Sequence, residues 1–334
     1  MTHARGLLRE AAVSCLALLA AMLAGCSSSG SSAGPVGAAG GDAGPVGGAG
    51  NDAGPVGGAG DDAGPVGGAG GGPATGCVDL GAAPLCTGNP VSPSVTDLSG
   101  TWILQTTGAQ TVTAPTYANP FHLKSINVML VQATQTGTAI SLTGNYCDRI
   151  QHDDPNNPAK VIVIDAWRLT QLPVARNGTF APDAQGQLTL TLPTLIEVAG
   201  AVLPDPVCEA LPTDPNDPRL FDTDSDGYPG ISVGLEGLIT GTLRSVQRQA
   251  TALQGVAVAA DRVEGGMAYE SDQSVVASDP PYIKSLYTLS ISSADPAVCS
   301  SSFVMVKVQV PDAVVASGGQ CAWVRDQEAT LLGL

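Results

Sequence analysis

The stretch Gly186–Pro193 reads GQLTLTLP, and its three leucines, Leu188, Leu190 and Leu192, alternate with polar residues. Successive side chains of a β-strand point to opposite faces, so the alternation places these leucines on one face of a half-buried strand. The residues Ala184-Gln185-Gly186 just before them are of the kind that forms short turns. The stretch therefore predicts a strand that begins directly after a turn.

The same pattern recurs along the chain. Ile140, Leu142 and Tyr146 share one face of a predicted strand, and Phe303 and Met305 share one face of another. The other expected strands and turns are spaced closely between them. The candidate strands are 138–146 (TAISLTGNY), 161–165 (VIVID), 231–237 (ISVGLEG), 239–249 (ITGTLRSVQRQ) and 302–310 (SFVMVKVQV), and further turns are expected at Thr136-Gly137-Thr138 and Asn177-Gly178.

Sequential strands joined by short turns favour an antiparallel β-barrel or β-sandwich, so we predict an all-β fold. Helical periodicity is missing until residues 321–332 (CAWVRDQEATLL), where one or two amphipathic helical turns are expected. Residues 77–334 are expected to form one β-rich domain, which is within the size range of all-β domains.

The N-terminus predicts export. Residues 1–9 carry Arg5 and Arg9, and an apolar run follows over residues 11–22 that is too short to span a bilayer. The next four residues, Leu23-Ala24-Gly25-Cys26, resemble the lipobox of bacterial lipoproteins. The resemblance implies cleavage after residue 25, acylation of Cys26 and, with Ser27 rather than aspartate next, sorting to the outer membrane of a Gram-negative cell. An ordinary cleaved signal peptide is the alternative.

Residues 26–76 predict a flexible tether. Within them, residues 31–70 repeat every ten residues, as in GDAGPVGGAG, and offer no side chain large enough to build a core. The chain carries 14 Lys and Arg against 30 Asp and Glu, with no Lys or Arg between Arg9 and Lys124. Because nucleic-acid binding needs clustered basic residues, nucleic acid is not expected as a partner.

Six cysteines remain after the signal peptide and Cys26 are set aside. An even number in an exported chain predicts disulfides, although six cysteines allow 15 pairings. We expect neighbours in the sequence to pair. The expected bridges are Cys77–Cys86, Cys147–Cys208 and Cys299–Cys321; the alternative, a zinc site, lacks the usual Cys-x₂-Cys spacing.

The segment 95–105 (VTDLSGTWILQ) contains Gly100-Thr101-Trp102 at the start of an expected strand. This resembles the Gly-x-Trp motif that opens the first strand of lipocalins and related small barrels. The resemblance implies that Trp102 packs across the closed end of a barrel and that a small apolar ligand could bind inside. It covers about ten residues, and the family's later Thr-Asp-Tyr motif is missing. Alternatively, Trp102 is only a large core residue.

The stretch Asp222–Gly230 (DTDSDGYPG) places Asp222, Asp224 and Asp226 at every second position, with a glycine after the third. Alternate carboxylates in a tight loop can converge on one cation, and oxygen ligands are those that Ca²⁺ prefers. The loop resembles the first half of an EF-hand loop and the loops of thrombospondin type 3 repeats, which implies that the Tyr228 carbonyl is a further ligand.

An EF-hand would have glutamate at the position of Val233, so the loop departs from that family. Asp217 and Glu236 are the nearest carboxylates that could complete the site, with Asp214 behind them. An acidic turn without an ion is the alternative. Two similar loops, DDPNNP at 153–158 and TDPNDP at 213–218, would be neighbours if Cys147 paired with Cys208, and Asp154 could then join the cluster.

No catalytic constellation is recognisable. Gly230–Gly234 matches Gly-x-Ser-x-Gly, but a strand pattern follows it, and His122 and His152 both precede Ser232. The sequence therefore predicts a non-enzymatic lipoprotein of the outer membrane, stabilised by calcium, with a structural or adhesive role at the cell envelope. The alternative is a lipocalin-like binder of a small apolar ligand, and a hydrolase whose residues form no recognisable pattern is the third.

Overall fold

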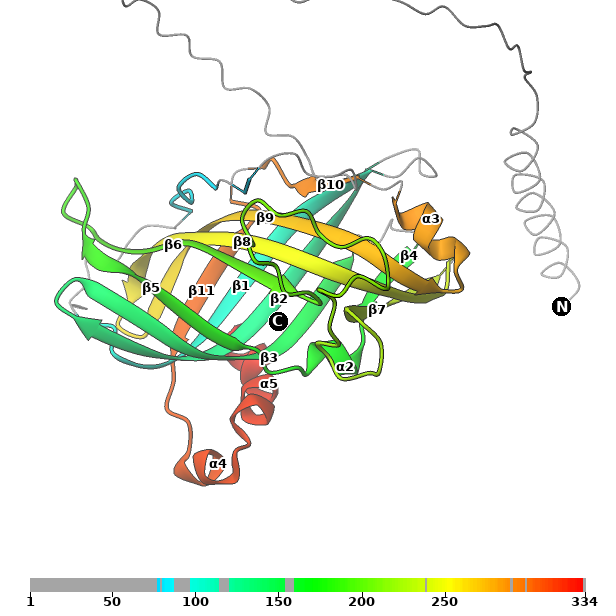
Figure 1. The fold of residues 1–334 in the computed structure, drawn as a ribbon. Helices are drawn as coiled ribbons and strands as arrows, with labels where there is room; N and C mark the ends of the chain where they lie inside the picture. Colours follow the sequence, from blue (N-terminus) through cyan, green and yellow to red (C-terminus); the bar gives the residue numbers. More distant parts are fainter. Residues whose placement is uncertain are drawn as a thin grey trace, which may run out of the picture. The chain divides into compact units, whose positions relative to one another are not determined.

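A computed structural model describes residues 77–332, except residues 79, 87–96, 114–119, 154–158, 238, 289–290 and 298. The predicted signal peptide, Cys26 and the tether lie outside the described residues. Within them, eleven strands join in one antiparallel sheet (Figure 1). The predicted all-β antiparallel fold is confirmed.

A strand occurs at each position where the sequence analysis expected one. The strands are β1 (Gly100–Thr113), β2 (Phe121–Thr136), β3 (Ala139–Asp153), β4 (Ala159–Val163), β5 (Pro173–Pro182), β6 (Leu188–Ala199), β7 (Ile231–Gly237), β8 (Gly241–Ala259), β9 (Arg262–Asp279), β10 (Ile291–Ala294) and β11 (Ser302–Lys307). The helices are α2 (Asp165–Arg168), α3 (Tyr282–Thr288), α4 (Asp312–Ser317) and α5 (Gln320–Leu331). Among the strands, β2, β5, β9 and β10 are ones that the sequence analysis did not predict.

Eight of the strands close into a barrel. Their pairings run β1–β2–β3–β5–β6–β8–β9–β11 and return from β11 to β1, so each barrel strand lies beside the next one in the sequence. Strands β7 and β4 extend the sheet from β8, and β10 pairs with β1. The structure thus shows the barrel rather than the sandwich.

The two ends of the barrel differ. The short turns β2–β3, β5–β6 and β8–β9 lie at one end, which we call the hairpin end. The longer connections, with β4, α2, β7 and α3, gather at the other end, which we call the loop end (Figure 1). The predicted turns at 136–138 and 184–186 are therefore confirmed.

The predicted turn at Asn177-Gly178 is wrong. Both residues lie inside β5 and pair with β3, Asn177 opposite Ser141 and Gly178 opposite Ile140. Glycine serves a close approach here, because a Cβ on Gly178 would lie 2.2 Å from the Thr191 carbonyl oxygen of β6. The dipeptide thus allows strands to pack closely instead of reversing the chain.

The hairpin half of the barrel is filled by apolar side chains. Trp102 is fully buried there, and its indole N–H donates to the Leu98 carbonyl at 2.7 Å. The ammonium of Lys307, at the end of the last barrel strand, lies 5.5 Å from the centre of the indole ring. Gly100 has φ +130°, a backbone conformation that favours glycine. Around Trp102 pack residues that include the predicted core positions Ile140, Leu142, Leu190, Leu192, Phe303 and Met305.

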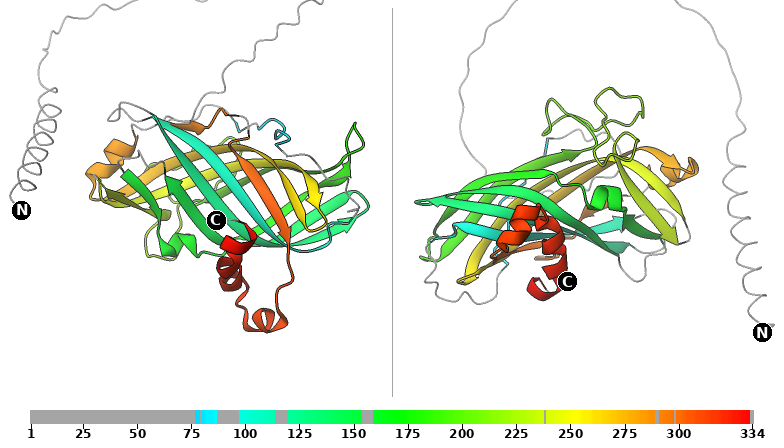
Figure 2. Two further views of the ribbon diagram at one scale, coloured as in Figure 1. Left: turned by 180° about the vertical axis from the view of Figure 1, so that it is seen from behind. Right: turned by 90° about the horizontal axis from the view of Figure 1, so that it is seen from below.

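Helix α5 covers the outer face of β2 and β3 (Figure 2). The register between these strands shifts at Val128/Met129, where Cys147 is the extra residue of a β-bulge. The bulge turns Cys147 and Asp148 away from the interior, and Cys147 bonds to Cys321 of α5. The helix expected at 321–332 is confirmed. Its Val324 is buried against Ile103 and Val128 on the outer face of the barrel.

The disulfides are Cys77–Cys208, Cys86–Cys299 and Cys147–Cys321, so all three expected neighbour pairings are wrong. The bridged cysteines are 131, 213 and 174 residues apart in the sequence. Closure of the barrel brings the segment before β1 next to the one before β11, where Cys86 and Cys299 pair, and proximity in sequence does not anticipate this. Since Cys147 does not pair with Cys208, the expected reason for the two proline-asparagine loops to be neighbours is lost, and residues 154–158 lie outside the described chain.

Candidate functional site

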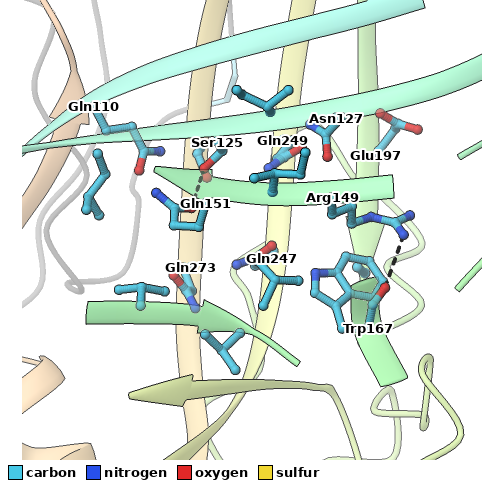
Figure 3. A pocket seen from close by; sticks show the side chains of 18 of the residues that line it. Gln110, Ser125, Asn127, Arg149, Gln151, Trp167, Glu197, Gln247, Gln249 and Gln273 are labelled. Atoms are coloured by element: carbon cyan, nitrogen blue, oxygen red, sulfur yellow. Dashed lines mark hydrogen bonds between the residues drawn. The ribbon is translucent and has the colours of Figure 1, made fainter. Parts of the chain in front are cut away.

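A cavity of about 120 Å³ lies in the loop half of the barrel. Its walls come from six barrel strands, β1, β2, β3, β6, β8 and β9. Residues of β4, β7, α2 and α3 complete the lining, among them Trp167 and Tyr287. Figure 3 shows the side chains that line it. The apolar packing of the hairpin half therefore stops partway along the barrel.

Neutral polar side chains make up about half of the lining, and apolar side chains make up most of the rest. The neutral polar residues are mostly amides (Figure 3). Two serines and three tyrosines add hydroxyl groups. The amides and serines are Gln110, Asn127, Gln151, Gln247, Gln249, Gln273, Ser125 and Ser271. In β2, β8 and β9, which each contribute a pair, the two residues are two apart, the spacing of side chains on one face. The inward face therefore changes from apolar to polar along the same strands.

Two tyrosines mark the boundary between the halves. Tyr146 and Tyr269 pack against the apolar core and also line the cavity. Gly108 leaves room for the second ring, because a Cβ there would lie 2.8 Å from Tyr269 Cζ. The Tyr269 hydroxyl accepts a hydrogen bond from Gln110 Nε2 at 3.1 Å. Burial raises the pKa of both phenols, so both remain neutral hydrogen-bonding groups at neutral pH.

Arg149 is held firmly in the wall. Its Nη1 donates to the carbonyls of Trp167 at 3.1 Å and Thr170 at 2.7 Å. Its guanidinium carbon lies 4.4 Å from the centre of the Tyr146 ring and 4.1 Å from that of Trp167. Burial lowers the pKa of Arg149 to about 10, so it is still charged at neutral pH. The arginine therefore fixes α2, which carries Trp167, against the barrel.

Glu197 supplies the opposite charge. Its Oε2 accepts a hydrogen bond from the Tyr146 hydroxyl at 2.6 Å. Burial raises the pKa of Glu197, while that hydrogen bond and the charges of Arg176 and Arg149 act to lower it. Arg176 is bound in turn to Thr251, its Nη2 donating to the carbonyl at 2.8 Å. Charged groups thus lie between the apolar core and the cavity with partners of their own.

The amides form only a partial network. Ser125 Oγ donates to Gln151 Oε1 at 2.9 Å, and Gln273 joins the Tyr287 hydroxyl at 3.2 Å and Ser245 Oγ at 2.9 Å. Gln151 Nε2 is buried with no hydrogen-bond partner in the described structure. A buried donor without a partner is costly, so a bound molecule that accepts from it would be stabilised.

The sequence analysis did not predict the polar lining of this cavity, because the expected strand pattern assigned apolar residues to the interior. A signal was present in Gln247 and Gln249, two residues apart in an expected strand. In the structure they pair across to Gln273 and Ser271 of β9. Four polar side chains on one face of two long strands are typical of a barrel interior that contains a polar cavity.

The aspartate loop lies in the connection between β6 and β7. One oxygen each from Asp222, Asp224 and Asp226 can lie within 4.8 Å of one another, so the predicted convergence is present. The Asp222 carboxylate accepts hydrogen bonds from the N–H groups of Asp226 at 3.2 Å and Gly227 at 2.8 Å. Gly227 has φ +89°, as the sharp turn requires.

Asp224 is the buried member of the group, with 6% of its surface exposed. Its Oδ2 accepts from the Ser232 N–H at 2.9 Å, whereas its Oδ1 is buried and has no partner among the described groups. Burial, with the charge of Asp226 nearby, raises the pKa of Asp224. A buried carboxylate oxygen without a partner beside two more carboxylates fits a hard cation such as Ca²⁺.

The other expected ligands are placed differently. The Asp217 carboxylate pairs with Arg219, at 2.6 Å from its Nη2, and Glu236 lies near the far end of β7. Neither belongs to the group of oxygens that could share a metal, and nor does Asp214. The Tyr228 ring lies 3.5 Å from the guanidinium carbon of Arg244. The main-chain carbonyl of Tyr228 remains a predicted ligand.

Ser232, the centre of the Gly-x-Ser-x-Gly match, is a structural residue. It is buried in β7, and its hydroxyl donates to the Asp226 carboxylate. The strand that contains it replaces the strand–turn–helix arrangement of a nucleophile elbow. The serine therefore links the aspartate loop to the strand that carries Val233 into the cavity wall.

Among the helices of the described chain, none has the length and apolar character needed to cross a membrane. No protein-family model matches the sequence, and neither the curated proteins nor the solved structures contain a match. The cavity and the aspartate loop must therefore be interpreted from their own geometry.

Proposed function

We propose that this protein binds a small polar molecule in the cavity of its barrel while a lipid anchor holds it at the outer membrane. The observation that carries the proposal is the unfilled loop half of the barrel, where amides and hydroxyls from five strands share the lining with apolar side chains. Protein interiors are otherwise closely packed, and buried polar groups are almost always hydrogen-bonded. The unpartnered Gln151 Nε2 supports a ligand that completes the network.

The lining favours a polar ligand over the apolar one that the resemblance to lipocalins implies. An apolar molecule would displace water from the cavity and leave the amides of Gln247, Gln249 and Gln151 without hydrogen-bond partners. The cost would be about 1–3 kcal/mol for each group. The barrel supports the binding part of that expectation, since Trp102 closes the end opposite the cavity.

The anchor part of the proposal comes from the lipobox resemblance of Leu23–Cys26. Several acyl chains on Cys26 would give a stable membrane attachment. The repeats between Cys26 and the first described cysteine, Cys77, would let the barrel stand away from the bilayer. A binding protein at the envelope gains from this arrangement, because it stays where its ligand passes.

We also propose a structural Ca²⁺ ion on Asp222, Asp224 and Asp226, with the Tyr228 carbonyl as a further ligand. The unpartnered Asp224 Oδ1 supports it. The ion would neutralise the mutual repulsion of three carboxylates and fix the start of β7. Within the described chain no histidine or cysteine joins the cluster, so the site fits a hard cation.

A structural or adhesive role is the second candidate. It is favoured by three disulfides and a filled hairpin half, which make a rigid body without any ligand. The two candidates differ in one measurable respect. Filling the cavity would abolish ligand binding by a binding barrel, whereas it would leave the function of a structural barrel unchanged.

The test is a thermal-shift screen of the mature chain against three classes of small molecule: neutral polar, charged and apolar. We expect neutral polar compounds to raise the melting temperature of the wild type. The variant Ser125→Phe fills the cavity from β2 and should abolish the shift. Lys124→Phe places the same ring on the exposed face of the same strand, so this variant should still show the shift in melting temperature.

Two results would contradict the proposal. One is that no compound of any class shifts the melting temperature. The other is that Ser125→Phe and the wild type respond equally to every compound that does. If Ser125→Phe fails to fold, Gln249→Leu, which removes the polar groups of one lining side chain, serves as the second variant.

A further inference from the structure

The charge distribution around the cavity is balanced. The lining contains one positive side chain, Arg149, and one negative side chain, Glu197. Arg149 already donates to two main-chain carbonyls, and Glu197 already accepts from Tyr146. A charged ligand would meet one like charge and one opposite charge, both already partnered, so the lining would not offset the cost of removing the ligand's charge from water. The site therefore selects against a net charge on the ligand.

The neutral groups have a specific chemical character. A glutamine or asparagine side chain offers both donors and an acceptor, and a serine or tyrosine hydroxyl likewise donates and accepts. A ligand that satisfies many such groups must also donate and accept at each position. Alcohol hydroxyl groups have this property, whereas ethers and ketones only accept and so would leave the acceptors of the lining unpaired.

The arrangement of these groups is also informative. They come from β1, β2, β3, β8 and β9, so they surround the cavity and do not lie in one plane (Figure 3). A flat nucleobase would need polar groups along its edge and apolar surfaces above and below. A saturated ring with hydroxyls pointing in several directions fits a site whose polar groups approach from many sides.

The size of the cavity limits the ligand further. A volume of about 120 Å³ corresponds to roughly eight to twelve water-sized groups. One sugar ring with its hydroxyls is of this size, and a fatty acid or a haem is much larger. The aromatic lining residues Trp167, Tyr146 and Tyr269 add apolar surface for the C–H groups of such a ring.

We infer that the cavity binds a neutral, polyhydroxylated molecule the size of one monosaccharide, with Gln151, Gln247 and Gln249 among the side chains that bind its hydroxyls. The inference rests on the proposed function, which states only that a small polar ligand binds in the cavity. A free sugar and the terminal unit of a glycan share this chemistry.

The experiment is calorimetric titration of the mature chain with glucose, galactose, mannose and N-acetylglucosamine. Glucuronate and glucosamine serve as charged counterparts of glucose, and cyclohexanol as a ring that has lost most of its hydroxyls. We expect at least one neutral sugar to bind saturably and at least tenfold more tightly than the charged counterparts. A disaccharide with that sugar at its non-reducing end distinguishes a glycan terminus from a free sugar.

The variants locate the binding. Gln249→Leu should weaken the sugar about tenfold, the loss expected for one ligand hydrogen bond. Gln254→Leu makes the same change on the outward face of β8 and should bind like the wild type. If Gln249→Leu fails to fold, Gln247→Leu replaces it.

The outcomes separate the two proposals. If no sugar binds but another small polar compound does, and Ser125→Phe prevents it, the sugar inference is overturned and the proposed function stands. If nothing binds to the wild type in any class, both are overturned. Equal binding of glucose and glucuronate would also overturn the inference, because the charge balance would then play no part.

Discussion

The Asp224 carboxylate shows how burial turns an acidic turn into a candidate cation site. One oxygen is held by the Ser232 N–H, and the other is buried without a partner, close to Asp222 and Asp226. The alternation of aspartates predicted this convergence, because it follows from the local backbone alone. The failure of Asp217 to join could not be predicted, since Arg219 competes for it only in the folded loop.

Asp224→Asn tests the cation at this scale. With calcium at a hundredfold excess over Kd, the wild type should gain about 2.7 kcal/mol in free energy of unfolding, and the variant should gain nothing. Without calcium the variant should melt no lower than the wild type, because its amide can donate toward the neighbouring carboxylates. Thermal melts in EDTA and in millimolar calcium measure both. Asp214→Asn, outside the cluster, should keep the calcium response; an equal gain in Asp224→Asn would refute the site.

At the scale of elements, the strands follow from alternation, as Leu190 and Leu192 in β6 show, and α5 follows from its periodicity. What alternation cannot show is which inward positions stay polar. Gln247 and Gln249 continue the inward face of Leu253, yet they line a cavity. The β-bulge at Cys147 could not be predicted either. An extra residue reverses the faces of the strand after it, but it can be recognised as extra only from the register with the partner strand.

Helix α5 contains a pH-sensitive contact. Glu328 is buried against the barrel, its Oε1 lacks a partner among the described groups, and burial with the charge of Asp148 raises its pKa to about 7. The charges of Arg168 and Arg325 oppose this shift. A carboxyl whose pKa is raised on folding contributes stability that is present at low pH and is lost as the pH rises through the folded pKa.

The stability of the wild type should therefore fall by about 1 kcal/mol between pH 6 and pH 8, the part of the change that Glu328 contributes. Glu328→Gln stays neutral and should remove this part. Urea unfolding of both proteins at the two pH values measures the difference. An identical pH dependence in the variant would mean that Glu328 is ionised in the folded protein throughout this range.

The bridge between Cys147 and Cys321 attaches the same helix to β3. In the double variant Cys147→Ser/Cys321→Ser, we expect a loss of about 2–4 kcal/mol in free energy of unfolding. Because α5 packs on the outer face, the barrel pairings should survive. Amide hydrogen exchange should therefore quicken in 320–331 far more than in β1 and β11. Uniform acceleration would show that the helix is integral to barrel stability.

At the scale of the whole molecule, closure of the barrel determines what the sequence could not predict. The ring places the segment around Cys86 near Cys299 and brings Cys77 to Cys208, so the bridges join parts that are distant in the chain. Trp102 could be assigned to a barrel start from its motif, but the cavity exists only because the inward faces of six barrel strands meet. Neither feature can be read from one segment.

The proposed lipid anchor would determine where this barrel works, and Cys26→Ala tests it. The thiol of Cys26 is the proposed site of acylation, so the variant should lose its acyl chains and move from the membrane fraction to the soluble fraction of exported protein. At about 0.8 kcal/mol per buried CH₂, removing several chains eliminates essentially all membrane affinity. Detergent phase partitioning measures the change.

Ser27→Ala, next to the cysteine, is the matched control and should remain in the detergent phase. Cys26 is 51 residues before Cys77, the first described residue of the barrel domain, so the proposed ligand binding and calcium-dependent melt should be unchanged in Cys26→Ala. Retention of this variant in the membrane fraction would mean that Leu23–Cys26 is not a lipobox and that another feature holds the protein at the envelope.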